Sequence, residues 1–319
     1  MSRYFGFLVA VLGLLLALRL APTLAADAPN TDAGKAAPSD VSLPDDTTPS
    51  DAEKHLLRYR FRLGEVVRSK VVQQTKIETT IAGSTQAAEM TSISTKAWRV
   101  TNVADDGRIT FDTMIEAVDM RQQMSGRQEV RYNSKTDPKP PPGYESAAAS
   151  VGKLLTTITI DPTGKLLRRE KKNQVGVDNL NTQIVVPLPQ EPVAVGEPWS
   201  VPLDVAVSLD GIPGNTKTLT VKNRYQVEKV ENGVAFISVQ TVLPPVNDPR
   251  IRAQLIQRMT KGTIRFDINA GRVLSQHTDL DEQVIGFSGP NSSLQYVGRF
   301  SEELIADNPQ ASGERALKR

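Results

Sequence analysis

The sequence has no cysteine and only two histidines among its 319 residues. Without cysteine, the chain can form neither a disulfide framework nor a lipid-modified cysteine behind a leader peptide, so its stability must come from a hydrophobic core. A cysteine nucleophile is excluded as well. His55 and His277 lack the neighbouring His or Cys ligands of a metal site, and we expect neither to be catalytic or to bind a metal.

Long apolar runs are missing after the first 25 residues. The run Tyr4–Leu18 follows the basic Arg3 and leads to small residues ending at Ala25, which is the layout of a signal peptide. Its length of about 15 residues is too short to span a bilayer. We therefore expect residues 1–25 to be a signal peptide, the protein to be exported to the periplasm, the exterior or the cell surface, and no stable membrane insertion after cleavage.

The chain without its first 25 residues also has no excess of either basic or acidic residues. Removing Arg3 and Arg19 from the 38 basic residues leaves 36, against 36 acidic residues. Proteins that bind nucleic acids carry a basic surplus on one face, so no nucleic-acid partner is expected.

Motifs for catalysis or cofactor binding are missing too, because the chain contains no P-loop, no glycine-rich dinucleotide turn and no EF-hand loop. The string Gly286–Pro290 has the wrong spacing for a serine-hydrolase elbow. Carboxylates remain as candidates, although their spacing does not show that any two face each other across a cleft. These carboxylates are Asp105, Asp106, Asp204, Asp210, Asp279, Asp281 and Glu282. The sequence predicts no enzyme, no cofactor and no metal, with a carboxylate-dependent hydrolase as a less favoured alternative.

Two segments have few large apolar residues. Residues 26–54 are mainly Asp, Pro, Thr, Ala and Ser, too polar to offset the entropy of ordering, and are predicted to be a disordered spacer. Residues 307–319 have a similar character and are predicted to be a disordered tail.

From Leu57 onward, alternating apolar and polar residues predict strands with one buried face. Two segments instead have helical character, Tyr144–Leu155 and Arg250–Thr260, the second preceded by the capping Asp248 and by Pro249 in its first turn. The predicted fold class is α+β, mostly antiparallel β. The predicted strand regions are Arg58–Leu63, Val67–Ile81, Ile93–Val103, Arg108–Met120 and Leu219–Val242.

The same landmarks occur twice in the same order. Each half contains a Gly-Glu pair, an aromatic strand, a turn glycine, a helical stretch and a closing hairpin. The matched landmarks are Gly64 and Gly196, Trp98 and Tyr225, Gly107 and Gly233, and Gly164 and Gly271. Such order predicts two related curved-sheet units with one helix each, at residues 55–186 and 187–306.

The turns have a clear physical basis. Asp106-Gly107 and Asn232-Gly233 predict tight hairpins with positive φ at both turn residues. Asp161 and Asp267 begin equivalent turns, and we interpret both as turn-initiating residues. A calcium site would need six or more oxygens, and only one carboxylate recurs here.

Four aromatic residues are candidates for ligand contact: Trp98, Trp199, Tyr225 and Phe266. Such residues usually form core. Alternatively, they line a cavity enclosed by a curled sheet around a hydrophobic ligand.

The leader, together with Leu57–Glu65 and Pro192–Trp199, resembles a family of exported β-rich bacterial proteins with no assigned activity. The resemblance covers about Leu57 to Ile305. More loosely, strands curling around a helix resemble periplasmic lipoprotein carriers with a half-barrel fold, which implies a curved sheet that holds lipid. The predicted function is a non-catalytic exported binding protein with an apolar ligand or a protein partner in its concave face. The alternative is a structural or envelope-assembly module whose strand edges pair with another protein.

Overall fold

In the computed structural model, residues 53–173, 185–209 and 215–306 are described. The predicted signal peptide and tail lie outside the described residues, as does the predicted spacer apart from Glu53 and Lys54. The elements are β1 (Lys54–His55), β2 (Val66–Ile81), β3 (Ser84–Val103), β4 (Ile109–Met124), β5 (Val130–Asn133), α2 (Glu145–Ser150), β6 (Leu154–Ile160), β7 (Leu166–Lys171), β8 (Val193–Ala194), β9 (Pro198–Ser208), β10 (Thr216–Glu231), β11 (Val234–Val242), α3 (Pro249–Leu255), the 3-10 turn Ile256–Arg258, β12 (Lys261–Asp267), β13 (Arg272–Ile285) and β14 (Ser292–Leu304).

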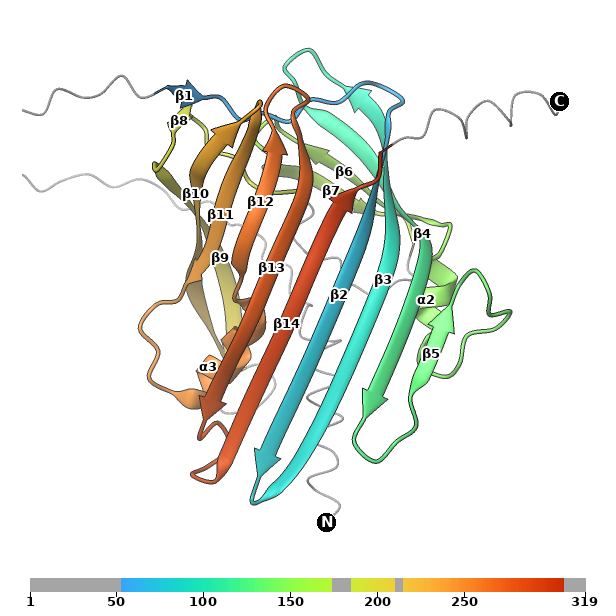
Figure 1. Cartoon of the computed structure of the whole chain (residues 1–319), viewed down its shortest axis with the longest axis vertical. Coiled ribbons are helices and arrows are strands. Elements are labelled where there is room, and N and C mark those ends of the chain that lie inside the picture. Colours follow the sequence, from blue (N-terminus) through green and yellow to red (C-terminus); the bar gives the residue numbers. More distant parts are fainter. Residues whose placement is uncertain (1–52, 174–184, 210–214, 307–319) are drawn as a thin grey trace, which may run out of the picture. The chain divides into compact units, whose positions relative to one another are not determined.

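Most of these strands form one antiparallel sheet of 12 strands. The order across the sheet is β7-β6-β4-β3-β2-β14-β13-β12-β11-β10-β9, with β5 paired to β4, and β1 and β8 form a separate pair. Figure 1 shows the long strands β2, β3, β13 and β14 in the middle, while the sheet curves away at both sides. The mostly antiparallel β prediction is confirmed. Strands from both predicted units join this one sheet, and the division into two related units stays a prediction.

The hairpin between β2 and β3 was not expected from the sequence. Its turn residues Ala82 and Gly83 have φ angles of 49° and 80°, the geometry of a tight two-residue hairpin. Alanine is uncommon at positive φ, so Ala82-Gly83 lacks the usual turn composition. Because of this hairpin, β3 begins at Ser84, well before the predicted start at Ile93.

The predicted strand Arg58–Leu63 is wrong. This segment makes no strand ladder: the Tyr59 amide donates to the Pro162 carbonyl oxygen (2.8 Å), and the Arg60 amide donates to Gly271 (2.9 Å). The alternation itself is partly correct, since Tyr59 is buried and Arg60 is exposed, but Leu63 is 71% exposed. The segment thus bridges two turns instead of pairing with a strand.

The second predicted helix is confirmed at its start. Asp248 caps α3 by accepting a hydrogen bond from the Arg250 amide (2.8 Å), and Pro249 occupies the first turn. The first predicted helix is too long at its end. Helix α2 stops at Ser150, and Gly152 follows with a φ of 72°, after which the β-branched residues of β6 favour a strand.

The turn predictions are confirmed in part. Asn232 and Gly233 have φ angles of 51° and 75°, as expected for their tight hairpin. At Asp106-Gly107 only the glycine has positive φ, so that turn is of a different type. Asp161 Oδ1 accepts from the Thr163 amide (2.8 Å) and Asp267 Oδ1 accepts from the Ala270 amide (2.7 Å), which confirms both as turn-initiating residues.

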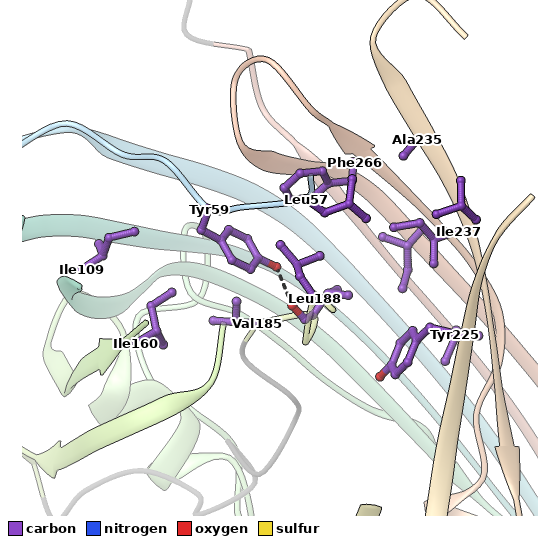
Figure 2. Packing of buried hydrophobic residues seen from close by; sticks show 14 of the residues in the cluster. Leu57, Tyr59, Ile109, Ile160, Val185, Leu188, Tyr225, Ala235, Ile237 and Phe266 are labelled. Carbon is purple, nitrogen blue, oxygen red and sulfur yellow. Dashed lines mark hydrogen bonds between the residues drawn. The ribbon is translucent and has the colours of Figure 1, made fainter. Parts of the chain in front are cut away.

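The main core brings the two sides of the sheet together. Phe111 and Ile158 from one side belong to the same buried cluster as Ile237 and Phe266 from the other. Between them runs Tyr59, whose hydroxyl donates to the Val186 carbonyl oxygen (3.0 Å). Figure 2 shows Tyr59 between Ile109 and Ile160 on one side and Phe266 on the other. The sheet therefore curves so that one face, the inner face, closes on itself at this end.

Candidate ligand-binding face

The inner face is traced along the central strands by the alternation of side chains. Val67 of β2 and Leu304 of β14 line a cavity beside the main core, so every second residue from them belongs to the same face. Helices α2 and α3 of the described residues lie on this face. Ala148 of α2 packs against Val118 of β4, and Leu255 of α3 packs in a buried cluster with residues of β9 and β10.

Away from the main core, this face carries three successive rows of paired residues across β4, β3, β2, β14 and β13. We call these residues the inner strip. The rows are Met120, Ser92, Gln73, Phe300 and Thr278; Gln122, Met90, Thr75, Gly298 and Leu280; and Met124, Ala88, Ile77, Tyr296 and Glu282. With strands about 4.8 Å apart, the strip is about 19 Å across.

The inner strip is almost uncharged. Its one charged residue is Glu282, whereas the three interleaved rows on the opposite, outer face of the same strands carry many charges. The charged residues of those outer rows are Asp119, Arg121, Glu89, Lys76, Arg299, Asp279 and Asp281. A sheet with one uncharged and one charged face is suited to hold apolar material on the first.

The strip leads at one end to the cavity beside the main core, which has a volume of about 30 Å³. Around it, Lys96 forms an ion pair with Glu302 (2.5 Å), and Gln276 donates to the other oxygen of Glu302 (2.8 Å). Arg272 donates to Glu65 (2.6 Å). The cavity thus combines aromatic walls with two buried or half-buried ion pairs.

The four predicted ligand-contact residues are not gathered around one cavity. Phe266 and Tyr225 are 0% and 1% exposed in the main core. Trp199 stacks on Tyr225 with ring centroids 5.4 Å apart, and its Nε1 donates to the Pro187 carbonyl oxygen (3.1 Å). Trp98 lines the cavity and stacks on Phe111 (4.7 Å). The geometry brings Trp98 to the cavity, and ligand contact by the four residues stays a prediction.

Sequence reasoning missed the inner strip itself. Its signal was present as alternation without charge, for example Gln73, Thr75 and Ile77 against Gln74, Lys76 and Glu78 in β2. Small and polar residues such as Ser92 and Thr75 do not stand out as binding residues, and the strand register is needed to align them in rows.

The candidate carboxylates are dispersed. Asp106 hydrogen bonds to Arg108, which lowers the pKa of this exposed carboxyl. Asp204 accepts from the Thr220 hydroxyl (2.6 Å), and Asp210 lies outside the described residues. Asp279 is exposed and contacts His277 (2.5 Å), on the face opposite Glu282. Asp279 and Asp281 lie two residues apart on the outer face, and the absence of catalysis stays a prediction.

Comparison with known proteins yields structural likenesses only. No family model matches the chain and no curated protein matches it, so the family resemblance stays a prediction. A structure of lipovitellin, described for its lipid–protein interactions, matches with 13% identity and a TM-score of 0.45, and it covers 77% of this chain and 26% of the lipovitellin chain. The open-gate secretin of the Salmonella SPI-1 type III secretion injectisome matches with 10% identity and a TM-score of 0.17, over 80% of this chain and 65% of that one.

The chain thus spans about a quarter of the lipovitellin chain that it matches. Across the described residues, no helix is long and apolar enough to cross a membrane. Since neither likeness bears on binding, we infer function from the residues of this chain.

Proposed function

We propose that this chain is a non-catalytic, exported binding protein that holds an apolar ligand along the inner strip. The contrast in charge between the two faces of the central strands supports this most directly. Burying apolar surface contributes about 25 cal/mol per Å², and an uncharged lining avoids the large cost of removing charges from water. The ligand would lie on the central strands between α2 and α3.

The composition of the strip adds support. Three of the six methionines in the chain, Met90, Met120 and Met124, belong to it. Methionine is flexible and polarisable, and surfaces that accept varied apolar partners use it often. Flexible side chains of this kind favour a class of apolar chains over a single rigid molecule.

Pairing of a strand edge with another protein has less support. The sheet ends at β7 and β9. The β9 strand contains Pro198 and Pro202, which cannot donate hydrogen bonds to an added strand. The β7 strand is short and carries Arg168, Arg169, Glu170 and Lys171, and charges of this kind protect edges from pairing.

A matched pair of variants on β3 tests the binding proposal. Met90→Lys places a charge on the inner strip, and Ile93→Lys places the same charge on the opposite face, where Ile93 is already exposed. Binding of the neutral dye N-phenyl-1-naphthylamine is measured by fluorescence. We expect Met90→Lys to weaken binding at least about tenfold, since a buried charge costs more than 1.4 kcal/mol. Ile93→Lys is expected to bind within about twofold of the unmodified protein.

Absence of dye binding by the unmodified protein would overturn the proposal. Equal binding by both variants would also overturn it, because the site would then lie away from the strip. Circular dichroism on each variant shows that the fold is intact.

Export rests on the leader Tyr4–Leu18 with its small residues up to Ala25. Amino-terminal sequencing of the protein from the envelope fraction tests it. We expect the mature chain to begin at Ala26 or Asp27, and recovery of the intact leader on a cytoplasmic protein would refute export.

We also propose that residues 55–186 and 187–306 derive from one duplicated unit. In support, β2, β3, β4, β6 and β7 lie in sheet order on one side, and β9 to β13 lie in the same order on the other. The Gly64 amide donates to Val100 (2.9 Å) and the Gly196 amide donates to Val227 (2.8 Å), and a β-bulge directly follows each acceptor. Sequence profiles built separately from homologues of each segment should align at Gly64 and Gly196, and profiles that align at neither would refute duplication.

A further inference from the structure

The cavity at the end of the inner strip contains two hydrogen-bond donors that no described residue satisfies. These are Nε1 of Trp98 and Nε of Arg272, both buried atoms for which no hydrogen-bond partner is found among the described residues. Both residues line the same cavity. Buried N–H groups without an acceptor are rare in proteins, so two of them around one cavity indicate a place for an acceptor.

The acceptors already present are in use. One carboxylate oxygen of Glu302 forms the ion pair with Lys96, and the other accepts a hydrogen bond from Gln276. One carboxylate oxygen of Glu65 accepts a hydrogen bond from Arg272 Nη1, and the other accepts one from the Arg62 amide. Each of these oxygens thus accepts at least one other hydrogen bond, and neither carboxylate accepts one from Trp98 Nε1 or Arg272 Nε.

The charges around the cavity are balanced. Lys96 and Arg272 supply two positive charges, and Glu302 and Glu65 supply two negative charges. An added anion would lie beside two carboxylates with no spare cation, and like charges in a half-buried site repel strongly. The missing partner is therefore best matched by a neutral oxygen.

The cavity is continuous with the inner strip along the strands. Gln276 and Glu302 pair with each other one row beyond Thr278 and Phe300, the first row of the strip. A ligand whose chain lies on the strip therefore has its end at the cavity. A volume of about 30 Å³ accommodates a group of about the size of one water molecule.

From this geometry, and resting on the proposed function, we propose that the cavity holds the carbonyl oxygen of a neutral acyl group, an ester or amide, at the end of the apolar ligand. Trp98 Nε1–H and Arg272 Nε–H donate to that oxygen, while the acyl chain lies along the inner strip. The ligand class is thus a neutral acyl lipid, and a bare hydrocarbon or a free fatty-acid anion fits less well.

Competition between two molecules of equal size tests this assignment. Methyl octanoate and undecane have the same number of non-hydrogen atoms, and only the ester has a carbonyl. The affinity of each compound is measured by its displacement of N-phenyl-1-naphthylamine from the full-length protein. Each affinity is then corrected for the partitioning of the compound between hexadecane and water, so that the two are compared as transfers from hexadecane to the protein. We expect the ester to bind at least about tenfold more tightly than the alkane on that scale, because the ester gains hydrogen bonds that hexadecane lacks.

Two variants remove the donors singly. Trp98→Phe keeps a ring against Phe111 and removes the indole N–H, and Arg272→Lys keeps the charge and removes Nε–H. Arg299→Lys is the matched control for Arg272→Lys, since Arg299 lies exposed on the outer face and does not line the cavity. We expect the preference for the ester to fall several-fold in each donor variant and to persist in the control.

The outcomes separate this inference from the proposed function. Equal affinity for ester and alkane in the unmodified protein, or an ester preference unchanged by both donor variants, overturns the carbonyl site and leaves apolar binding intact; the N–H groups then serve an ordered water. Octanoate anion binding more tightly than the ester also overturns it. If the dye does not bind to the unmodified protein at all, the proposed function itself is refuted. Unchanged alkane affinity in the donor variants shows that these variants are folded.

Discussion

Removing one hydroxyl, in Tyr59→Phe, tests how the two sides of the sheet are held together. The Tyr59 side chain is 4% exposed, and its hydroxyl donates to the Val186 carbonyl oxygen at 3.0 Å. Its ring packs on Phe61 (6.1 Å between centroids) and edge-on to Phe266 (5.6 Å). Phenylalanine keeps these ring contacts and leaves the carbonyl without this donor.

The expected cost follows from that loss. A buried carbonyl deprived of its hydrogen bond destabilises a protein by about 1–3 kcal/mol. For a chain of this size, each kcal/mol lowers the midpoint of thermal unfolding by about 2–4 °C. Urea unfolding at pH 7, followed by circular dichroism, measures the free energy directly.

The pH dependence supplies a second readout. Burial raises the pKa of the Tyr59 hydroxyl well above its ordinary value, and this outweighs the hydrogen bond to Val186, which lowers the pKa. The folded state therefore keeps the proton at a pH where the unfolded state has lost it. Stability is fully present below the unfolded pKa of about 10 and declines as the pH rises from there toward the folded pKa. Tyr59→Phe lacks this group and therefore this part of the loss of stability. The difference in free energy of unfolding between the variant and the unmodified protein therefore becomes smaller above pH 10.

Tyr132→Phe is the control for this experiment. Tyr132 is also buried and stacks on Tyr144 (6.2 Å), but its hydroxyl makes no hydrogen bond that we find within the described residues. We expect Tyr132→Phe to change stability by less than about 0.5 kcal/mol. If Tyr59→Phe were as stable as the unmodified protein at pH 7, or if its deficit did not narrow in alkali, the reasoning on Tyr59 would be refuted.

Three further perturbations address the turns, the core and the helix cap. Gly271→Ala is expected to lower the free energy of unfolding in urea by about 1–3 kcal/mol more than Gly126→Ala. Both glycines have positive φ, but of the two only a Cβ at Gly271 would meet backbone, 2.7 Å from the Arg60 amide nitrogen. Equal losses in the two variants would contradict this close approach. Phe266→Ala is expected to cost about 3–5 kcal/mol by the same assay, as for a large side chain removed from a packed core, and a cost under 1 kcal/mol would show that the core is loose. Asp248→Ala removes the α3 cap and is expected to lower the thermal midpoint at pH 7. Hydrogen bonds from Arg250 lower the pKa of Asp248, so the stability that this carboxylate contributes is present above pH 4 and is lost as the pH falls through the folded pKa. The thermal midpoints of the two proteins therefore converge in acid, and a difference that persisted at pH 2 would argue against the cap.

Local features were predictable from the sequence because nearby residues alone govern them. The Asn232-Gly233 hairpin and the Asp248 cap of α3 depend on backbone preferences within a few residues, and both appear as expected. The long strands β2 and β10 follow from β-branched, alternating stretches. The errors are local as well: Ala82-Gly83 carries no strong turn signal, and α2 ends sooner than its composition suggests.

The candidate site was decided by tertiary structure. Alternation in one strand shows that two faces differ, but only the pairing register sets Met90 beside Thr75, and Thr75 beside Gly298, and so creates an uncharged strip. In the same way, Trp98 and Arg272 are far apart in sequence and meet at one cavity because β14 joins β2 to β13. The sequence by itself determined strand character, turns and a helix cap, which arise from short-range preferences. The curvature of the sheet, the closing of the core and the joining of the site required long-range pairings, whose energies depend on residues that no local pattern connects.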